Sequence, residues 1–469
     1  MTTTAEVVIC GAGIAGVSTA YHLAVKHGLK DVVLVDERPP LSLTSANSAE
    51  CYRNWWPGPG DAMVGLMNRS IGILEELSRE TGNAFWLNRR GYLYATADPA
   101  RIPAFIAAAL EAASLGAGPL RLHGDYPGLE NIEGLMPYTP APADGFEGQS
   151  TGADVILDPE IIQRHLPYLS KGTVAVLHAR RAGWFNARDM GVYLLQCARE
   201  HGVKVVQARV EAVDVVNHRV EAARLRSAEG PINLQTHHFV DAAGPFLKSV
   251  GELLGVELPV YSELHTKVAL SDHLGLVPRD APLLNWTDSQ TLAWNEDERA
   301  ELAPSDETRW LLGRFPSGVH TRPEGPADSP IILVMWDYHT NSTEPVFPPS
   351  FDPSYPDIAM RGLARMIPSL RAYFNRMPKP QVDGGYYTRT RENRPLIGPL
   401  PVRGAYVISA FSGFGMMASC GAGELLAAHI TGSELPHYAP AFMLERYEDK
   451  EYQRLLELAE YRSTVIRET

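Results

Sequence analysis

The N-terminal segment AEVVICGAGIAGVSTAYHLAVKHGLKDVVLVDE constrains the fold more than any other part of the chain. Residues 7–10 are apolar and suit a buried parallel strand, residues 14–27 are mostly apolar at helical spacing, and residues 32–35 form a second apolar run. The order of strand, glycine-rich turn, helix and strand predicts a βαβ unit of a parallel sheet. The turn carries a G-x-G-x-x-G motif, formed by Gly11, Gly13 and Gly16.

The glycine-rich turn has the features of a dinucleotide site. Its glycines permit a tight turn and let a pyrophosphate approach the backbone near Ile14 and Ala15, where the helix N-terminus adds partial positive charge. Asp36 closes the second strand about 20 residues after Gly16, where an acid that binds a ribose is expected, and Glu37 follows it. A dinucleotide site is therefore predicted, and this unit alone leaves open which dinucleotide it holds.

The charge balance of the chain excludes partners that require clustered basic residues. The 469 residues carry a formal net charge of −13, with a pI near 5.6. Nucleic acids and anionic membranes both bind through clustered Lys and Arg, so neither is an expected partner. With 45% hydrophobic and 21% charged residues, the chain can bury the cores of two or three domains, and a small-molecule partner is expected.

The N-terminus and the cysteines indicate a soluble protein of a reducing compartment. MTTTAEVVICGAG lacks the basic region and apolar stretch of a secretory signal, and with no run of about 18 apolar residues no transmembrane segment is predicted. The cysteines form no C-x-x-C pair and have no companion His at metal-ligand spacing. We therefore expect a cytoplasmic location, buried thiols, no disulfide and no metal site. The four cysteines are Cys10, Cys51, Cys197 and Cys420.

Further α/β units follow at a distance from the first. PARIPAFIAAALEAASL, residues 99–115, predicts a helix, and Asn186 is an N-cap candidate for a helix that stops at Gly202 before two β-rich runs. Residues 259–380 are richer in Trp, Tyr and Pro, and strand-like runs such as IILVMWDY predict a mainly antiparallel layer. Residues 405–430 predict a strand, a glycine-rich FSGFG turn and a helix.

Several motifs occur together in one order: the N-terminal fingerprint, VDAAGPF at residues 240–246, RENRPLIGP at residues 391–399, and a strand followed by SGFG at residues 412–415. In this combination the chain resembles the D-amino-acid oxidase family of FAD-dependent amine oxidoreductases. That family contains sarcosine oxidase, glycine oxidase and dimethylglycine dehydrogenase. The matching segments are scattered over nearly the whole chain. A NAD-dependent dehydrogenase has no reason for the C-terminal glycine-rich unit, so the resemblance favours FAD.

The resemblance implies an α/β fold in which a Rossmann-like FAD-binding domain is assembled from discontinuous segments. An α+β substrate domain, built on an antiparallel sheet, would be inserted between them. The expected ranges are 1–90, 155–258 and 384–435 for the FAD domain, 91–154 and 259–383 for the substrate domain, and 436–469 for a C-terminal helix. That helix is amphipathic and would cover the domain or contact another subunit.

The resemblance also implies which residues contact FAD. The pyrophosphate would lie over the three glycines of the N-terminal turn and the ribose on Asp36, while Ala243 and Gly244 approach the cofactor through their backbone. TSANS, residues 44–48, would hydrogen-bond the pyrophosphate or the ring. A helix N-terminus beside the pyrimidine edge of the flavin would stabilise negative charge there. Further contacts are expected from Thr44, Ser45, Asn47, Ser48, Val210, Gly413, Phe414, Gly415 and Met416.

The attachment of FAD is expected to be non-covalent. The family often has a histidine in the segment after the first βαβ unit that bonds covalently to FAD, and this sequence has none there. Residues 260–380, where sarcosine oxidases attach the flavin, contain no cysteine. Cys51 is the one thiol close in sequence to the region that would wrap the ring.

The resemblance places a substrate-binding arginine in TRTRENRPLIGPL. In YTRT, Arg389 takes the place of a basic residue that holds the substrate carboxylate, and a guanidinium can do so through two parallel hydrogen bonds. Internal ion pairs are the alternative for Arg389 and its neighbours. Arg53 and Trp55 could face the substrate, and Lys267 either activates oxygen near flavin N5 or has a structural role.

The expected reaction is oxidation of the C–N bond of a small carboxylated amine or amino acid, with N-methyl and other secondary or tertiary amino acids favoured. A hydride passes to flavin N5 and the imine hydrolyses, so position, a dry pocket and charge stabilisation are what the protein supplies. Oxidation of a 2-hydroxy acid and a non-catalytic FAD-binding assembly protein are the alternatives. Oxygen or another electron acceptor, and the oligomeric state, stay open.

Overall fold

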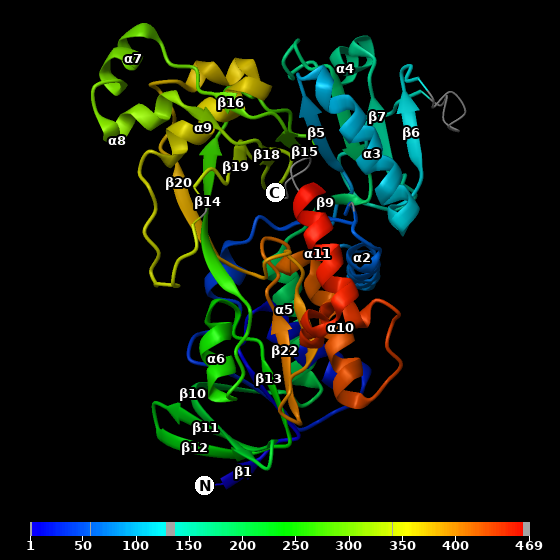
Figure 1. Cartoon of the computed structure of the whole chain (residues 1–469), viewed down its shortest axis with the longest axis vertical. Coiled ribbons are helices and arrows are strands. Elements are labelled where there is room, and N and C mark those ends of the chain that lie inside the picture. Colours follow the sequence, from blue (N-terminus) through cyan, green and yellow to red (C-terminus); the bar gives the residue numbers. More distant parts are fainter. Residues whose placement is uncertain (1, 57, 128–136, 340, 463–469) are drawn as a thin grey trace.

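The computed structural model describes residues 2–56, 58–127, 137–339 and 341–462. Two nine-stranded sheets organise the chain, one in the lower half of Figure 1 and one in the upper half. The long strand β14 and the segment from β20 to β21 run between the two halves (Figure 1). The mixed α/β architecture with discontinuous segments agrees with the predicted fold class.

The lower sheet has a parallel centre, in which β10, β3, β2, β13 and β22 pair in that order. Alternate residues of β2 face opposite sides, so Val7 and Ile9 enter one core while Val8 and Cys10 enter another. From edge to edge the strands are β1 (Thr2–Thr4), β12 (Gly230–Gln235), β11 (Arg219–Ser227), β10 (Lys204–Val216), β3 (Val32–Asp36), β2 (Val7–Cys10), β13 (His238–Asp241), β22 (Ala405–Ser409) and β21 (Leu396–Pro399).

Helices cover both faces of the lower sheet. The core that contains Val7 and Ile9 is shared with α1, α2, α5 and α10, whereas Leu247 and Val250 of α6 belong to the core on the opposite face. Asn186 caps α5 by accepting a hydrogen bond from the amide of Asp189, as the sequence predicts. The helices are α1 (Ile14–Tyr21), α2 (Ala62–Glu80), α5 (Ala187–Glu200), α6 (Leu247–Leu253) and α10 (Gly415–Thr431).

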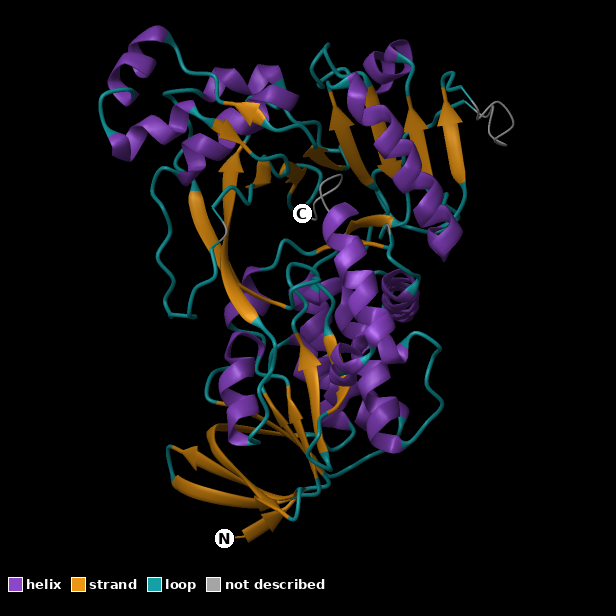
Figure 2. Ribbon diagram, viewed as in Figure 1, coloured by secondary structure: helices purple, strands orange, loops and turns teal. Residues whose placement is uncertain are grey.

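The upper sheet is largely antiparallel, with parallel pairs only at β5–β15 and β6–β7 among its described strands. Helices pack around it, as the ribbon in Figure 2 shows. Its strands are β20 (Gln381–Arg389), β14 (Tyr261–Ser271), β19 (Ile331–Met335), β18 (Val319–Pro323), β15 (Leu283–Trp286), β5 (Tyr92–Thr96), β8 (Ala175–Ala179), β7 (Ala153–Ile156) and β6 (Leu120–His123). Its helices are α3 (Ile102–Ala112), α4 (Pro159–His165), α7 (Glu296–Leu302), α8 (Asp306–Arg309) and α9 (Tyr355–Met366).

Two small ribbons complete the described strands: β4 (Cys51–Arg53) with β9 (Ala182–Trp184), and β16 (Gln290–Thr291) with β17 (Arg314–Phe315). Strand pairing departs from the predicted segments at β8 and at β20. Residues 155–258 are assigned to the cofactor domain by sequence, yet β8 pairs with β5 and β7 of the upper sheet. Residues 384–389 of β20 have the same assignment, yet they pair with β14 of the upper sheet. Every residue of β8 is buried there, so the mostly apolar run AVLHA packs in the core of the upper sheet.

The C-terminal segment is not one helix from residue 436. Two 3₁₀ turns, Ala439–Phe442 and Leu444–Glu448, precede α11 (Lys450–Arg462). Pro436 and Pro440 lack amide hydrogens, which prevents a continuous helix from starting at the predicted position. The last seven predicted residues, 463–469, lie outside the described part of the chain.

One helical stretch among the described residues, Pro99–Ala117, is long and apolar enough to span a membrane, with a hydropathy of 1.3. The sequence analysis predicted no such segment because it required an uninterrupted apolar run, and Arg101 and Glu111 interrupt this one. Phe105 and Ala109 of α3 are fully buried, and α3 packs on β7 and β8. A single stretch is weak evidence for a span, because the core helix of a soluble protein passes the same test.

Candidate cofactor and substrate site

The glycine-rich turn is packed directly against the segment that follows β13. Gly11 has φ +110°, and a Cβ atom there would come within 2.3 Å of the carbonyl oxygen of Ala242. A Cβ at Gly16 would lie 1.9 Å from the carbonyl oxygen of Gly11, and one at Gly13 would lie 3.3 Å from Ser45 Oγ. The three glycines therefore allow three close approaches: to the next strand's loop, within the turn itself, and to the segment after β3.

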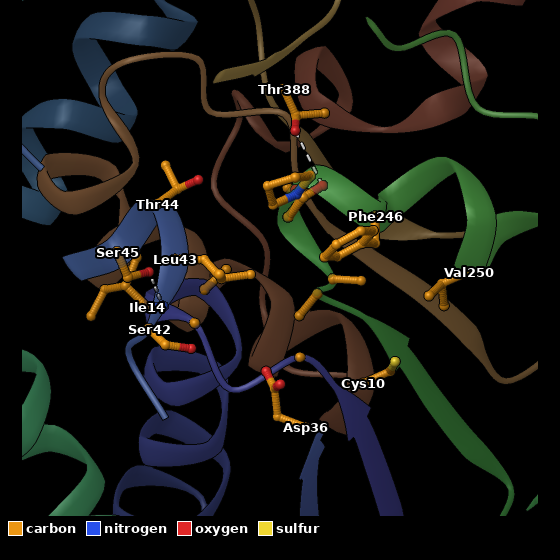
Figure 3. Close-up of a pocket in the computed structure, with 18 of the residues that line it drawn as sticks. Cys10, Ile14, Asp36, Ser42, Leu43, Thr44, Ser45, Phe246, Val250 and Thr388 are labelled. Carbon is orange, nitrogen blue, oxygen red and sulfur yellow. Dashed lines mark hydrogen bonds between the residues drawn. The ribbon is translucent and has the colours of Figure 1, made fainter. Parts of the chain in front are cut away.

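A cavity of about 690 Å³ opens in front of this turn. The lining residues labelled in Figure 3 come from three distant parts of the chain: the N-terminal unit, the segment around Phe246, and the strand that carries Thr388. Residues 208–211 of β10 and residues at the start of α10 complete the walls of this cavity. Its size and glycine-lined floor suit an elongated dinucleotide. The predicted residues that line this larger cavity are Gly11, Gly13, Ile14, Ala15, Asp36, Glu37, Thr44, Ser45, Ser48, Val210, Ala243, Gly244, Gly413, Gly415 and Met416.

Three predicted cofactor residues have other positions. Gly16 packs inside the turn, and the side chain of Phe414 is buried with its ring 5.0 Å from that of Trp56. Asn47 lines a second, smaller cavity instead. For these residues, as for those lining the larger cavity, contact with FAD stays a prediction.

Hydrogen bonds hold the polar groups of the larger cavity in place. Asp36 accepts from the amides of Ala12, at 2.8 Å, and Arg38, at 2.9 Å, which fixes its carboxylate at the end of β3. Ser45 Oγ accepts from the amide of Ile14 at 3.0 Å, one of the free N–H groups at the start of α1 (Figure 3). The hydroxyl of Ser45 thus joins the helix N-terminus to the cavity wall.

A buried acid lies at the end of β13, just before the backbone that faces the larger cavity. Asp241 has no accessible surface, and burial raises the pKa of its carboxyl well above the ordinary value. One oxygen accepts from the amide of Ala243 at 3.2 Å, and the other has no hydrogen-bond partner among the described residues. A neutral acid at this position does not repel a bound diphosphate.

The smaller cavity, of about 60 Å³, adjoins the larger one. Both cavities are lined by Thr44, Tyr387 and Gly413, so one end of a ligand in the larger cavity faces the smaller one. Its other lining residues come from strands of the upper sheet, from the segment 47–53 and from α10, and they include several ionisable side chains. They are Asn47, Ala49, Cys51, Arg53, Tyr92, His265, Thr266, Lys267, Leu283, His320, Met335, Asp337, Gly384, Gly385 and Met417.

Two of the predicted substrate residues line the smaller cavity. Arg53 is buried, and its guanidinium lies 4.4 Å from the ring centre of Trp56 and 5.6 Å from that of Tyr92. Lys267 donates to the carbonyl oxygens of Asn47, at 3.2 Å, and Ser48, at 3.0 Å. Its ammonium also lies 3.2 Å from Asp383, so Lys267 ties β14 to the segment that wraps the site.

The other two predicted substrate residues line neither cavity. Trp55 is buried, and its indole nitrogen has no partner among the described residues. Arg389 donates from Nη1 to Glu263 at 2.7 Å and from Nε to Ser412 at 3.1 Å. The ion pair that the sequence left as an alternative is therefore present at Arg389, and its contact with a substrate stays a prediction.

The sequence reasoning missed two ionisable residues of the smaller cavity, Asp337 and His320. Asp337 lies two residues after the end of the apolar strand β19, and a carboxylate that follows a buried strand was the available signal. His320 donates from Nδ1 to the carbonyl oxygen of Gly318 at 2.9 Å, and burial lowers its pKa, so the ring is neutral. Among the described residues no group of three or more His, Cys, Asp or Glu side chains could hold a metal ion.

Known proteins resemble the chain over nearly its whole length. Human mitochondrial dimethylglycine dehydrogenase is 25% identical over 442 residues, which is 92% of this chain, but the chain spans 43% of that protein's length. The structure of L-proline dehydrogenase from P. horikoshii has a TM-score of 0.70 at 18% identity and covers 96% of this chain and 99% of its own. Glycine oxidase from Geobacillus kaustophilus has a TM-score of 0.69 at 15% identity, covering 95% and 99%.

These structures share the fold of the chain. The family model described as "FAD dependent oxidoreductase" (DAO) matches residues 6–429, which include both sheets' cavity-lining segments. This match confirms the resemblance that the fingerprint, VDAAGPF and SGFG segments predict. The chain belongs to the DAO family of FAD-dependent oxidoreductases.

Proposed function

We propose that this protein oxidises the C–N bond of a small carboxylated amine, with secondary and tertiary amino acids favoured, and yields an imine that hydrolyses in water. The observation that carries the proposal is the small, charged cavity that adjoins the larger one at Thr44, Tyr387 and Gly413. Dimethylglycine dehydrogenase, glycine oxidase and L-proline dehydrogenase, by their names, act on substrates of this class.

The residues of the larger cavity fit FAD. The glycine turn admits a diphosphate at the N-terminus of α1, and the fixed carboxylate of Asp36 is placed for a ribose. Gly415 begins α10, whose free N–H groups would favour negative charge on the pyrimidine edge of the ring. FAD, when bound, supplies the hydride acceptor of the reaction.

Non-covalent binding of FAD is part of the proposal. Cys51 lines the smaller cavity, donates its thiol hydrogen to the carbonyl oxygen of Ala49 at 3.1 Å, and has a pKa raised by burial. A thiol of raised pKa is a poor nucleophile toward a flavin. We also keep the reducing cytoplasm as the proposed location, which the four unpaired cysteines suit.

We assign the substrate carboxylate to Arg53. Arg53 lines the smaller cavity with its guanidinium against two aromatic rings, whereas Arg389 lines neither cavity. A guanidinium fixes both the charge and the orientation of a carboxylate through two parallel hydrogen bonds. Buried aromatic walls around Arg53 exclude water, which strengthens that ion pair.

Lys267 faces the same cavity, and its ammonium is held by two backbone carbonyls and by the carboxylate of Asp383 at 3.2 Å. A cation fixed there is suited to stabilise negative charge that develops when oxygen is reduced, as the family resemblance implies. Oxygen and a different electron acceptor are both compatible with this arrangement, and relatives named as oxidases and as dehydrogenases share the fold.

Anaerobic reduction of the flavin tests the proposal. The FAD-loaded protein is mixed with N-methyl amino acids, free amino acids of both hands, and 2-hydroxy acids, and the bleaching of flavin absorbance is followed. Rapid bleaching by an N-methyl amino acid, reversed by air or an artificial acceptor, is the expected result. Bleaching by hydroxy acids alone would establish the alternative substrate class. A flavin that dithionite reduces but no panel member does would favour the non-catalytic assembly role.

A further inference from the structure

Four side chains of alternating charge form a chain that ends in the smaller cavity. Arg389 donates to Glu263 at 2.7 Å, Glu263 lies 3.2 Å from Nε2 of His265, and Nδ1 of His265 lies 2.7 Å from Oδ1 of Asp337. Glu263 and His265 are two residues apart on β14 and so share one face of the sheet. Arg389 is on the neighbouring strand β20, and Asp337 follows β19 on the other side.

The imidazole of His265 is fixed from three directions. Both ring nitrogens face carboxylates, and the ring is stacked on Tyr387 with centres 3.8 Å apart and planes 18° from parallel. Burial disfavours the charged imidazole, but the neighbouring carboxylates, Asp337 foremost, raise the pKa of His265 above its ordinary value. The ring is therefore held as a cation that donates from both nitrogens.

Asp337 keeps one oxygen for a ligand. Oδ1 accepts from His265, whereas no described residue donates a hydrogen bond to Oδ2. Its side chain keeps 28% of its surface accessible, and it lines the smaller cavity. Burial opposes its ionisation, but the charge of His265 keeps the pKa of Asp337 below the ordinary value, so the group is a carboxylate.

The carboxylate of Asp337 and the guanidinium of Arg53 are on the walls of the same small cavity. Because this cavity measures only about 60 Å³, a ligand whose carboxylate is held by Arg53 lies close to Asp337. A zwitterion complements this pair of charges, whereas the anion of a 2-hydroxy acid places no positive charge beside Asp337.

We propose that Oδ2 of Asp337 binds the protonatable nitrogen of the substrate, and that Arg389, Glu263 and His265 are positioning residues that hold Asp337. This inference rests on the proposed function and narrows it, because the site then selects amino carboxylates over 2-hydroxy acids. It also gives Arg389 a role: through Glu263 and His265 it orients the group that touches the substrate.

Three carboxylic acids of the same shape test the inference: 2-amino-2-methylpropanoate, 2-hydroxy-2-methylpropanoate and 2,2-dimethylpropanoate. None has a hydrogen on the carbon that carries the varied group, so none can reduce the flavin by losing a hydride there. Each is titrated into the FAD-loaded protein at pH 7, and the dissociation constant is taken from the change in flavin absorbance. Wild-type protein should bind the amino acid at least about 10-fold more tightly than the hydroxy acid, since the ammonium adds a charge-assisted hydrogen bond.

In Asp337→Asn the amino acid should bind about 10-fold more weakly, while the constant for the hydroxy acid changes less than about 3-fold. Glu263→Gln, which breaks the chain two side chains from the ligand, should reduce the preference for the amino acid in the same direction by a smaller factor. Asp357→Asn is the matched control, since Asp357 pairs with Arg361 on α9 and lines neither cavity. It should keep wild-type constants.

Equal binding of the three acids by wild-type protein would overturn the inference, as would an equal loss for all three in Asp337→Asn. If Asp337→Asn fails to retain FAD, the inference is decided by the dissociation constants of the three acids for wild-type protein and for Glu263→Gln. If an N-methyl amino acid reduces the flavin but the preference for the amino acid over the hydroxy acid does not depend on Asp337, the inference is refuted and the proposed function stands. If that preference depends on Asp337 but no amine reduces the flavin, the inference stands and the proposed function is refuted. No absorbance change with any acid would count against both.

Discussion

Substitution of Gly16 by alanine should damage both the fold and the cofactor site. The new Cβ would lie 1.9 Å from the carbonyl oxygen of Gly11 and 3.2 Å from Ile9 Cγ2, whereas ordinary contacts begin at 3.4 Å. The carbonyl oxygen of Gly11 belongs to the backbone, so the turn itself must move until the separation of this oxygen from the new Cβ increases from 1.9 Å to at least 3.4 Å. Overpacking of this kind costs about 1–3 kcal/mol of unfolding free energy. Because N–H···O hydrogen bonds span only about 2.7–3.2 Å, a displaced turn would also lose hydrogen bonds to a bound diphosphate.

Urea unfolding of the FAD-free protein measures the first effect, and quenching of FAD fluorescence on titration measures the second. We expect Gly16→Ala to lose about 1–3 kcal/mol of stability and at least about 10-fold in FAD affinity. Gly172→Ala is the control, because its Cβ would meet nothing closer than 3.7 Å. It should leave stability unchanged or raise it by about 0.4–1 kcal/mol. A Gly16→Ala protein with wild-type stability and FAD affinity would refute the packing role assigned to this glycine.

Three other substitutions test separate parts of the site. Arg53→Lys should lower kcat/KM for the amine substrate about 10- to 100-fold, because one charge-assisted hydrogen bond to the carboxylate is lost, while FAD content is unchanged; steady-state kinetics at wild-type values would contradict the assignment. Acid precipitation of wild-type and Cys51→Ser protein should release all FAD into the supernatant, whereas flavin retained only in the wild-type pellet would show attachment at Cys51. The raised pKa of Asp241 means that the native state holds this proton more tightly than the unfolded chain does, so the contribution of Asp241 to stability should fall as pH rises above the unfolded value of about 3.9, by at most about 1.4 kcal/mol per pH unit. Asp241→Asn removes this contribution, so the unfolding free energy of wild-type protein minus that of the variant should fall between pH 4 and 8 in urea unfolding, and a difference that stays constant with pH would show that the folded protein does not hold this proton more tightly.

The parts of the site that local sequence encodes were predicted well. Gly16 is required by contacts with Gly11 and Ile9, which lie within the same turn and strand, and the G-x-G-x-x-G motif predicts this requirement. Gly11 and Gly13 meet Ala242 and Ser45, whose approach the motif implies only through the fold that it is typical of. The position of Asp36 at the end of β3 follows from the same βαβ unit. Asn186 and Gly202 likewise bound α5 through hydrogen bonds between near neighbours.

The parts that depend on remote pairing were not predicted. The apolar run of β8 reads like any buried strand, and only its partners β5 and β7 place it in the upper sheet. Asp337 lies beside His265 because β19 pairs with β14, 72 residues away in the chain. A single sequence gives the residue types of such a cluster but not the register that brings them together.

The arginine-rich stretch shows why residue type alone does not reveal a substrate site. Arg389 pairs with Glu263, 126 residues away, and Arg394 donates to the carbonyl oxygen of Pro59. Glu392, between them, binds the buried Arg446 near the C-terminus at 2.7 Å. Through these contacts the arginine-rich stretch connects β20 to the N-terminal unit and to the C-terminal turns. A buried charge must be paired to be tolerated, so a cluster of charges before an apolar strand predicts partners without saying whether they are protein or ligand. The distinction comes from the cavities: Arg53 and Asp337 line one and Arg389 lines neither, which is why the substrate charges are assigned to the first two.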